Sequence, residues 1–435
     1  MSADVTAVEV VAVGDELLEG VHPDLNSPWI GARLAEYGRR LRGVQVVSDD
    51  EPDIERAVRA AAARAPLVIV TGGLGPTLDD VTRHGVARAA GLALEESAVA
   101  LANVRAWYER AGREMPAANL RQALTPVGGT VIRNDFGTAP GFRCAVGAAQ
   151  VLVLPGPPRE LHGVWQAEVH PWLQAHPVSA DAVAVRRLHF SDIPESKFAE
   201  VVGAWMDRAA SPLLGCTVKG GVLTARILGR APTGAAAEAL AEARAAELAA
   251  LFPGRLLGRG DEGRVAALLG AELLARGLTV TVAESCTGGL VAAELTSVAG
   301  ISAALREAFV TYADAAKVAR LGVPPGLIAE HGAVSAPVAA AMARGALAAA
   351  GADLALAISG VAGPGGGSAE KPVGLVWFGV ARRAGLEGAG LAGADCEVWT
   401  VERRWPPAPR AQIRDWAAQK GLALLLEVAR GGAPG

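Results

Sequence analysis

Short apolar runs alternate with longer amphipathic segments over the first 165 or so residues. The runs at 8–13, 67–70 and 151–154 are almost entirely apolar, and each is followed within two residues by a glycine. The pattern predicts strands there and at 41–47, with helices at 27–38 and 53–64. Apolar strands separated by helices are typical of a parallel sheet covered on both faces. We therefore expect a three-layer α/β domain over residues 1–170.

A different pattern begins after a segment at 171–183 whose prolines interrupt the apolar periodicity, as a linker would. The expected elements are strand 183–190, helix 193–208, strands 215–218 and 221–228, and helix 232–251. Asp192 and Glu195 form a capping-box-like start for the first helix, and Lys219-Gly220 suits the hairpin turn. This βαββα order predicts a small α+β domain over 171–258.

The third region, 259–435, again alternates strand and helix signals. Asp261 is placed to cap a helix that runs to Arg276 and is closed by Gly277. Strands are expected at 278–283, 354–358, 373–380 and 398–401, and a final amphipathic helix at 408–430. Two of these strands run directly into glycine loops, ESCTGG and SGVAGPGGG. A second α/β domain is expected here.

Composition limits the possible partners. The 435 residues carry 41 Lys and Arg against 45 Asp and Glu, a net charge of −4, and only 4% are aromatic. A globally basic nucleic-acid coat is excluded, and side chains on which bases could stack are scarce. The chain has four cysteines, Cys144, Cys216, Cys286 and Cys396, with no CxxC pair, so neither a disulfide framework nor a structural zinc site is expected. With no signal-peptide pattern and no apolar run of bilayer-spanning length, we expect a cytoplasmic protein that does not enter membranes.

The first glycine loop, TGGLGPTLDD at 71–80, follows an apolar strand. Glycines leave backbone N–H groups open to phosphate oxygens, and Asp79 and Asp80 could hold a divalent cation, Mg²⁺ or a transition metal, that bridges them. The alternative is a tight turn whose aspartates cap the next helix. Loops GDE at 14–16, GTAPG at 137–141 and PGPP at 155–158 favour a ligand, because ligands bind beyond the carboxyl ends of parallel strands. The expected ligand contacts are Gly14, Glu16, Gly72, Gly73, Gly75, Thr77, Gly137, Thr138 and Gly156.

Ser285 lies in the third region, at a predicted strand-to-helix junction where a hydroxyl can be exposed next to backbone donors for an oxyanion. A serine nucleophile needs a base, and no histidine is near in sequence. Tyr312 and Lys317, in FVTYADAAK, offer one, since a buried lysine can accept a proton that a tyrosine hydroxyl relays. The alternative is that Ser285 only caps the following helix. Cys286 is a rival nucleophile but is expected to be inert packing.

The second glycine loop in this region, residues 359–367, has five glycines in nine residues. That costs chain entropy unless a backbone must approach a ligand closely, and a nucleotide phosphate is the natural one; the alternative is a flexible loop. The expected substrate contacts are Thr287, Gly288, Gly289, Ser359, Gly360, Gly363, Gly365 and Gly366.

The motifs VGDELLEG, TGGLGPTLDDVTR, GREMPAANLRQA, NDFGTAPGF and LPGPPRE resemble the N-terminal half of the competence/damage-inducible protein CinA family. The resemblance implies a molybdopterin-binding-like (MoaB/MogA-like) fold and a metal-dependent ADP-ribose pyrophosphatase. Molybdopterin binding is the competing interpretation of the same loops. Leu78 stands where the family usually has a lysine, which removes a cation that could contact phosphate. The sequence HPDLN at 22–26 replaces an asparagine-rich stretch.

The motifs TVAESCTGGLVAAELTSVAGIS, FVTYADAAK, LGVPPGLIAEHGAVS, SGVAGPGGG and EKPVGLVWFGVA resemble the C-terminal half of the same family, the nicotinamide mononucleotide (NMN) deamidases. The resemblance implies Ser285 as nucleophile, Tyr312 and Lys317 as its activating pair, and no cofactor. The family pattern TYSNEAK is TYADAAK here, and the family's threonine before GxAGPGGG is Ser359, so each proposed catalytic group is kept.

The middle segment resembles a KH-like domain, but its one GxxG-like candidate, at 219–222, falls in a hairpin turn. We therefore expect no nucleic-acid partner, small nucleotides (NMN and ADP-ribose) as ligands, and a homodimer. The leading hypothesis is an NMN amidohydrolase that is bifunctional with the pyrophosphatase. The alternative is a non-catalytic pterin- or nucleotide-binding protein linked to competence or DNA damage.

Overall fold

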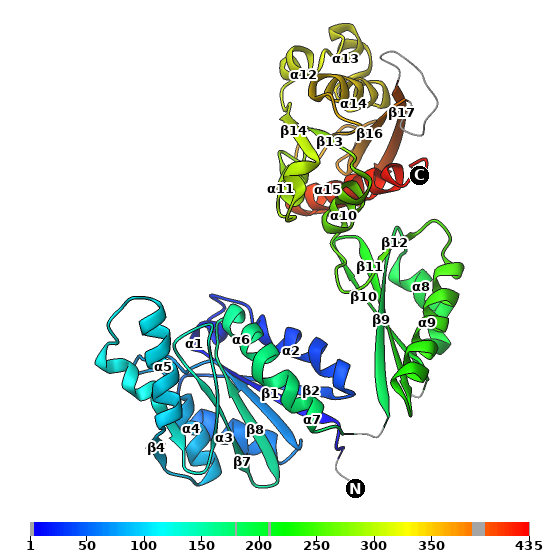
Figure 1. The fold of residues 1–435 in the computed structure, drawn as a ribbon. Helices are drawn as coiled ribbons and strands as arrows, with labels where there is room; N and C mark the ends of the chain where they lie inside the picture. Colours follow the sequence, from blue (N-terminus) through cyan, green and yellow to red (C-terminus); the bar gives the residue numbers. More distant parts are fainter. Residues whose placement is uncertain (1–3, 179–180, 208–209, 385–395, 435) are drawn as a thin grey trace. The chain divides into compact units, whose positions relative to one another are not determined.

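The computed structural model describes residues 4–178, 181–207, 210–384 and 396–434. Its contacts divide the chain into two compact units, Met1–Ala184 with Arg230–Ala237 and Val185–Gly229 with Glu238–Gly435 (Figure 1). Most elements expected for the middle domain therefore group with the C-terminal region. The three-domain boundaries near 170 and 258 stay a prediction.

The first unit contains a six-stranded sheet of order β2-β1-β3-β8-β7-β6. Its strands are β1 (Ala7–Val13), β2 (Arg40–Val47), β3 (Leu67–Thr71), β6 (Thr130–Ile132), β7 (Gly141–Val146) and β8 (Ala149–Leu154). The four predicted strands β2, β1, β3 and β8 pair in parallel, as expected. β7 and β6 add an antiparallel edge that was not predicted. The three residues of β6 are too few to show a periodicity.

Helices cover both faces of this sheet. They are α1 (Asp15–Leu18), α2 (Asn26–Leu34), α3 (Glu51–Ala62), α4 (Thr82–Ala90), α5 (Ala98–Arg110), α6 (Pro158–Val164) and α7 (His170–Ala175). One core joins the sheet to α3 and α4 through Ile54, Val58 and Val86, and the other joins it to α2 and α6 through Ile30 and Leu161. A small pair, β4 (Leu94–Glu96) with β5 (Leu124–Pro126), lies outside this sheet. The expected layered α/β fold is confirmed.

The βαββα order of the middle segment is confirmed and gains one strand. Its sheet has the order β10-β11-β9-β12, from β9 (Ala182–Ser191), β10 (Leu213–Lys219), β11 (Val222–Ala231) and β12 (Leu256–Arg259), with helices α8 (Glu195–Val202) and α9 (Gly234–Leu251). The hairpin turn is Gly220-Gly221 rather than Lys219-Gly220, because Lys219 pairs with Val222 and both glycines have positive φ.

Two predicted helix caps in this part of the chain are wrong. Helix α8 follows Pro194 with no side-chain cap, so Asp192 does not begin it, and the expected helix end at Arg208 lies outside the described residues. Helix α10 (Val265–Arg276) follows Arg264, not Asp261, again with no side-chain cap. Asp261 instead forms an ion pair with Arg187, so a short-range cap pattern was overridden by a partner distant in sequence. The C-terminal stop at Gly277, with φ 65°, is confirmed.

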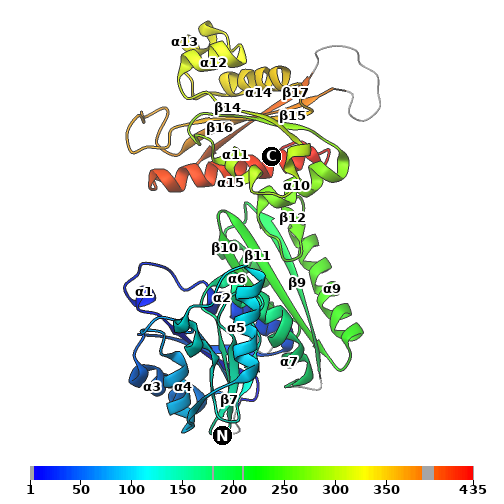
Figure 2. The same cartoon turned by 60° about the vertical axis from the view of Figure 1, so that its left-hand side comes forward.

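The C-terminal region contains a five-stranded sheet of order β14-β13-β15-β16-β17. Its strands are β13 (Val280–Glu284), β14 (Leu305–Val310), β15 (Leu354–Gly360), β16 (Leu375–Arg383) and β17 (Cys396–Arg404). β14, β13 and β15 are parallel, and β16 and β17 antiparallel. Besides α10, its helices are α11 (Leu290–Thr296), α12 (Asp314–Leu321), α13 (Pro325–His331), α14 (Ala336–Ala350) and α15 (Arg410–Ala429). Figure 2 shows α14 and α15 on opposite faces of this sheet, where separate hydrophobic cores lie.

None of the helices in the described ranges combines the length and the apolar character needed to cross a bilayer.

Candidate functional site

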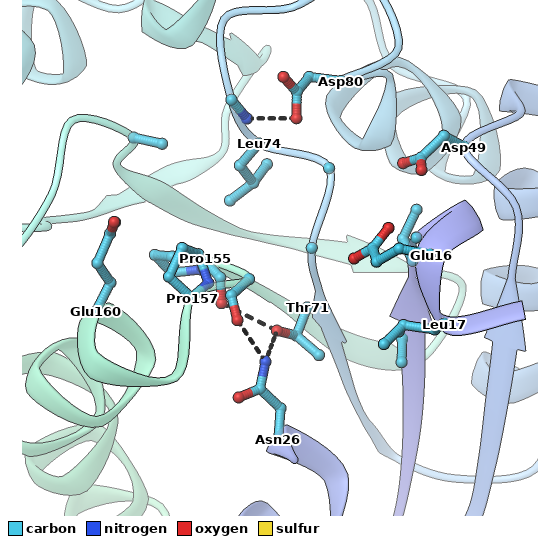
Figure 3. A pocket seen from close by; sticks show the side chains of 18 of the residues that line it. Glu16, Leu17, Asn26, Asp49, Thr71, Leu74, Asp80, Pro155, Pro157 and Glu160 are labelled. Atoms are coloured by element: carbon cyan, nitrogen blue, oxygen red, sulfur yellow. Dashed lines mark hydrogen bonds between the residues drawn. The ribbon is translucent and has the colours of Figure 1, made fainter. Parts of the chain in front are cut away.

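A pocket of about 650 Å³ opens at the carboxyl edge of the first sheet, where β1, β3 and β8 end (Figure 3). The predicted residues that line it are Gly14, Glu16, Gly72, Gly73, Gly75, Thr77, Asp79, Asp80, Thr138 and Gly156. Gly137 does not line the pocket; a Cβ there would lie 1.8 Å from the Glu160 carboxylate, which packs against it. The topology thus brings loops that are distant in sequence to one cavity, as parallel strands require.

Close packing between these loops explains two of the glycines. Gly72 has φ 102°, and a Cβ on it would lie 2.1 Å from the carbonyl oxygen of Val13. Gly73 has φ 61°, and its Cβ would lie 2.2 Å from the Thr82 hydroxyl. A side chain at either position is excluded by the protein itself. The loop therefore needs its glycines for its own fold as well as for any ligand.

A hydrogen-bonded pair that the sequence patterns did not indicate ties the pocket loops together. The Asn26 Nδ2 donates to the carbonyl oxygen of Gly156 at 2.7 Å and to the Thr71 hydroxyl at 3.1 Å, as Figure 3 shows. The Thr71 hydroxyl donates in turn to the carbonyl oxygen of Pro155 at 2.9 Å. Asn26 belongs to the HPDLN stretch, so its position in a family motif was the available signal.

The pocket is acidic. Within the described residues its charged lining consists of Glu16, Asp24, Asp49, Asp79, Asp80 and Glu160, with no Lys or Arg. Burial raises the pKa of the Asp49 carboxyl, and the negative charges of Asp15, Glu16 and Asp79 raise it further. A phosphate ligand would meet repulsion here unless a cation accompanies it.

The predicted metal pair does not form a ready-made cation site. The Asp80 carboxylate accepts from the N–H of Gly75 at 2.7 Å, from the N–H of Thr77 at 2.9 Å and from the Thr77 hydroxyl, so it shapes its own loop. Asp79 is exposed, and a hydrogen bond from Thr77 lowers the pKa of its carboxyl. In the described parts of the chain no three His, Cys, Asp or Glu side chains gather closely enough to hold a metal ion. The metal requirement stays a prediction.

The second candidate site lies at the carboxyl edge of the C-terminal sheet. Glu284, the last residue of β13, is opposite Val310 of β14 and Ile358 of β15. Ser285 follows Glu284 and donates its N–H to the carbonyl oxygen of Ile358 at 3.0 Å. Ser359 is in β15 and Tyr312 follows the end of β14 by two residues, so both come from the strands that flank β13. The three parallel strands bring the predicted residues to one edge.

Glu284 organises the loop that follows Ser285. Its carboxylate, 1% exposed, accepts from the N–H groups of Gly289 at 2.9 Å, Val291 at 3.2 Å and Ala292 at 2.9 Å. These are the donors that the start of α11 leaves unpaired. The Glu284 carboxylate, and not the Ser285 hydroxyl, therefore accepts the hydrogen bonds of the N–H groups at the start of α11. The alternative role of Ser285 as a helix cap is not observed. Among the described residues the Ser285 hydroxyl has no hydrogen-bond partner.

The backbone donors available for an oxyanion are fewer than expected. The N–H of Gly288 donates to the carbonyl oxygen of Ser285 at 3.1 Å, and that of Gly289 donates to Glu284. Within the described chain the N–H groups of Cys286 and Thr287 donate to no backbone carbonyl. The structure thus shifts the candidate oxyanion donors from Thr287–Gly289 to Cys286 and Thr287. Gly288 and Gly289, with φ 61° and 95°, shape the loop.

Lys317 is 1% exposed, on the first turns of α12. Its Nζ donates to the carbonyl oxygen of Tyr312 at 3.0 Å and lies 3.3 Å from the Asp314 Oδ1. The Tyr312 side chain is 61% exposed, and its hydroxyl accepts from Arg410 at 2.9 Å. In the described residues no hydrogen bond links the Lys317 amine, the Tyr312 hydroxyl and the Ser285 hydroxyl. The expected relay is therefore not closed in this structure.

Two arginines at the start of α15 hold this site together and were missed from the sequence. Arg410 bridges the Tyr312 hydroxyl and the carbonyl oxygen of Gly363, which it reaches at 2.7 Å. Arg414 donates to the carbonyl oxygens of Cys286 at 3.2 Å and Thr287 at 2.7 Å. Their i, i+4 spacing places them on one helix face, but only the fold shows which loops that face meets.

The glycine loop after β15 is partly structural. The Ser359 hydroxyl donates to the carbonyl oxygen of Ala333 at 2.7 Å, and a Cβ on Gly360 would lie 2.5 Å from the Val376 side chain. A Cβ on Gly365 or Gly366 would meet nothing within 4 Å. Of the predicted contacts in this loop, Gly365 and Gly366 are therefore the two with open space beside the backbone, which a phosphate would need.

Glu284→Gln should lower the free energy of unfolding by about 1–3 kcal/mol, because the amide offers one acceptor oxygen where a carboxylate served three buried donors. Chemical denaturation with a mass-based or spectroscopic readout measures it. Glu307→Gln, an exposed change on β14, is the matched control and should leave stability unchanged. Equal stability of the two variants would contradict this role for Glu284.

Cys286 should resist alkylation in the folded protein, because burial raises the pKa of its thiol to about 12. Iodoacetamide treatment at pH 8, followed by peptide mass mapping, should leave Cys286 unmodified until the protein is denatured. Cys216, which is half-buried, provides the comparison. Rapid labelling of Cys286 in the native state would restore it as a rival nucleophile.

Comparisons with known proteins match both halves of the chain. Residues 262–429 match the CinA C-terminal domain, and residues 9–175 match the probable molybdopterin binding domain. A putative competence-damage inducible protein of Symbiobacterium thermophilum is 41% identical over 419 residues, covering 96% of this chain and 97% of that protein. A CinA-like protein of Anaeromyxobacter dehalogenans is 40% identical over 385 residues, covering 88% of this chain and 93% of that protein. The crystal structure of the competence/damage inducible protein CihA from Agrobacterium tumefaciens is 41% identical, covers 38% of this chain and 93% of its own, and has a TM-score of 0.35.

The sequence identity extends over nearly the whole length of both chains, and each of the two sites described above lies within one of the matched domains. The chain therefore belongs to the CinA family of competence/damage-inducible proteins.

Proposed function

We propose that the C-terminal site hydrolyses the carboxamide of NMN, giving nicotinate mononucleotide and ammonia. The observation that carries this proposal is a combination of three groups beyond the end of β13, all within the described residues. They are a Ser285 hydroxyl without a hydrogen-bond partner, two backbone N–H groups beside it that pair with no backbone carbonyl, and a nearly fully buried lysine on α12. A nucleophile, oxyanion donors and a base are the groups that amide hydrolysis needs.

In the proposed reaction the Ser285 Oγ attacks the carboxamide carbon, and its proton passes to the Lys317 amine. The carboxamide oxygen becomes an oxyanion held by the N–H groups of Cys286 and Thr287. Collapse of this intermediate breaks the C–N bond, and the nitrogen leaves as ammonia with the proton from Lys317. Water then attacks the Ser285 ester, which releases the carboxylate product and restores the hydroxyl. No metal takes part in the proposed steps.

The proton path belongs to the substrate-bound state in this proposal. Catalytic hydrogen bonds often tighten only when substrate is present, so the open relay between Lys317, Tyr312 and Ser285 is compatible with it. Arg410, which contacts both the Tyr312 hydroxyl and the loop at Gly363, is placed to respond to a substrate phosphate near Gly365 and Gly366.

For the N-terminal pocket we propose ADP-ribose as ligand and a metal-dependent pyrophosphatase as activity. The support is the cavity of about 650 Å³ whose lining includes the predicted loop glycines. In the described residues the acidic side chains and the loop-bound Asp80 carboxylate do not fit a ready-made metal site, so no step of phosphate cleavage is assigned to them. A non-catalytic pterin- or nucleotide-binding pocket is the second candidate. It is favoured because the Asp80 carboxylate accepts hydrogen bonds from its own loop, at Gly75 and Thr77, instead of being available to a metal ion.

One experiment separates these functions. The purified full-length protein is given NMN or ADP-ribose separately, with and without added Mg²⁺ or Mn²⁺, and ammonia and AMP are measured. Ammonia from NMN in the presence of a chelator supports the amidohydrolase. AMP from ADP-ribose only with metal supports the pyrophosphatase, whereas turnover of neither substrate supports the binding protein.

A further inference from the structure

Asp192 has an unusual backbone conformation. Directly after β9 it adopts φ 55°, and it is the one non-glycine residue with positive φ in the described part of the chain. Aspartate and asparagine tolerate this left-handed region better than most residues, and such positions persist where the surroundings hold them. Asp192 does not form the helix cap that its sequence predicted. Its side chain has another role.

The Asp192 carboxylate meets three cations of the second unit, one on α15, one on β17 and one in the turn before β12. Its Oδ2 lies 2.6 Å from the Lys420 Nζ, 3.3 Å from an Arg255 nitrogen and 3.6 Å from an Arg403 nitrogen. The Lys420 side chain is only 6% exposed, whereas that of Asp192 is 27% exposed. A buried ammonium is stable only with charged or hydrogen-bonding partners. The Asp192 carboxylate is therefore a direct charged partner of a nearly buried lysine and helps to hold it in place.

Lys420 lies on α15, the helix that carries Arg410 and Arg414 to the serine loop. It follows Arg414 by six residues, about 9 Å along the axis and about 120° around it. Buried residues of α15 such as Ile413 and Leu422 pack in the same hydrophobic core. One face of α15 therefore contacts Asp192 through Lys420, and a different face contacts the serine loop through Arg414. Because α15 is a continuous packed helix, a displacement at Lys420 also displaces Arg414.

We propose that Asp192 is a positioning residue for the Ser285 site: by holding Lys420 it fixes α15 so that Arg414 orients the loop at Cys286 and Thr287. The inference rests on the proposed function for what that loop does. Arg414 contacts the carbonyl oxygens of the two residues whose N–H groups are the candidate oxyanion donors. A shift of α15 would therefore rotate those peptide groups, and a displacement of this kind is felt strongly in rate. It also gives the middle segment a role in catalysis without any contact with substrate.

The test uses the full-length Asp192→Asn variant, since asparagine keeps the tolerance for positive φ and removes only the charge. We expect kcat for NMN to fall by about tenfold or more with a smaller change in KM. Glu242→Gln is the matched control: Glu242 also joins two arginines, Arg186 and Arg259, in the same unit but has no ion pair with α15 in the described chain, so kcat should not change.

Two further measurements separate positioning from a loss of stability. In an Arg414→Met background the Asp192→Asn change should add little to the loss in kcat, because both act by the same route. Hydrogen exchange of residues 286–289, followed by mass spectrometry well below the melting temperature, should be faster in Asp192→Asn. This readout does not need turnover, so it still decides the inference if the wild-type protein releases no ammonia from NMN and the proposed function fails.

If the single variant does not fold, Asp192→Asn combined with Lys420→Met removes both charges and should fold. It is expected to show the same kinetic loss and the same faster exchange. Unchanged kcat and exchange in either variant, a lower melting temperature alone, or losses that simply add to those of Arg414→Met would each overturn the proposal.

Discussion

Ser285→Ala should reduce ammonia release from NMN by about 10³-fold or more, because in the proposed reaction the acyl-enzyme ester forms on the Ser285 hydroxyl. Ser285 directly follows the carboxyl end of β13, and its hydroxyl has no hydrogen-bond partner among the described residues. The two backbone N–H groups beside it pair with no backbone carbonyl in that part of the chain. The rate of ammonia release is measured with an enzyme-coupled assay, and nicotinate mononucleotide is measured separately by chromatography.

The control for this variant is Ser302→Ala, an exposed serine in the same region that lies outside the site. It should retain wild-type turnover, and both variants should unfold at the wild-type temperature. Turnover by Ser285→Ala close to that of the wild-type protein would exclude the serine mechanism and, with it, the assignment of the C-terminal site.

Lys317→Met should lower kcat for NMN by about 10²–10⁴-fold, the usual contribution of a general base. Methionine keeps much of the length and fills the buried space, so the loss would reflect the missing amine more than a cavity. The Lys317 side chain is 1% exposed and lies beside the Tyr312 carbonyl, so solvent cannot easily replace it as proton acceptor.

Comparing the kcat of Tyr312→Phe with that of Lys317→Met shows whether the proton passes through the Tyr312 hydroxyl or directly to the Lys317 amine. A loss in Tyr312→Phe as large as that in Lys317→Met would support a relay through the phenol, and a small loss would support direct transfer to the lysine. Lys197→Met, which removes an exposed lysine paired with Glu200, is the control and should be neutral. A fully active Lys317→Met protein would remove lysine from the mechanism.

Much of the fold was predictable from local patterns. The strands at 8–13, 67–70 and 151–154 are apolar on both faces because helices cover both sides of the sheet, so even short runs identified them. The short antiparallel strand β6 was not predictable, because its three residues carry no periodicity. The caps assigned to Asp192 and Asp261 failed for another reason: each carboxylate pairs with cations distant in sequence.

The candidate sites divide in the same way. The strands predicted at 278–283 and 354–358 lead into the loops that carry Ser285 and Ser359, and because these strands pair in parallel both residues lie at one edge of the sheet. The strand before Tyr312, β14, was not predicted, so the position of Tyr312 beside them emerges only from the fold. Which backbone and side-chain groups remain available for a ligand depends on contacts that the fold creates. Glu284 uses the N–H of Gly289, Asp80 uses those of its own loop, and α15 supplies Arg410 and Arg414. Hydrogen-bond partners are decided by contacts between elements distant in the chain, and no local pattern records them.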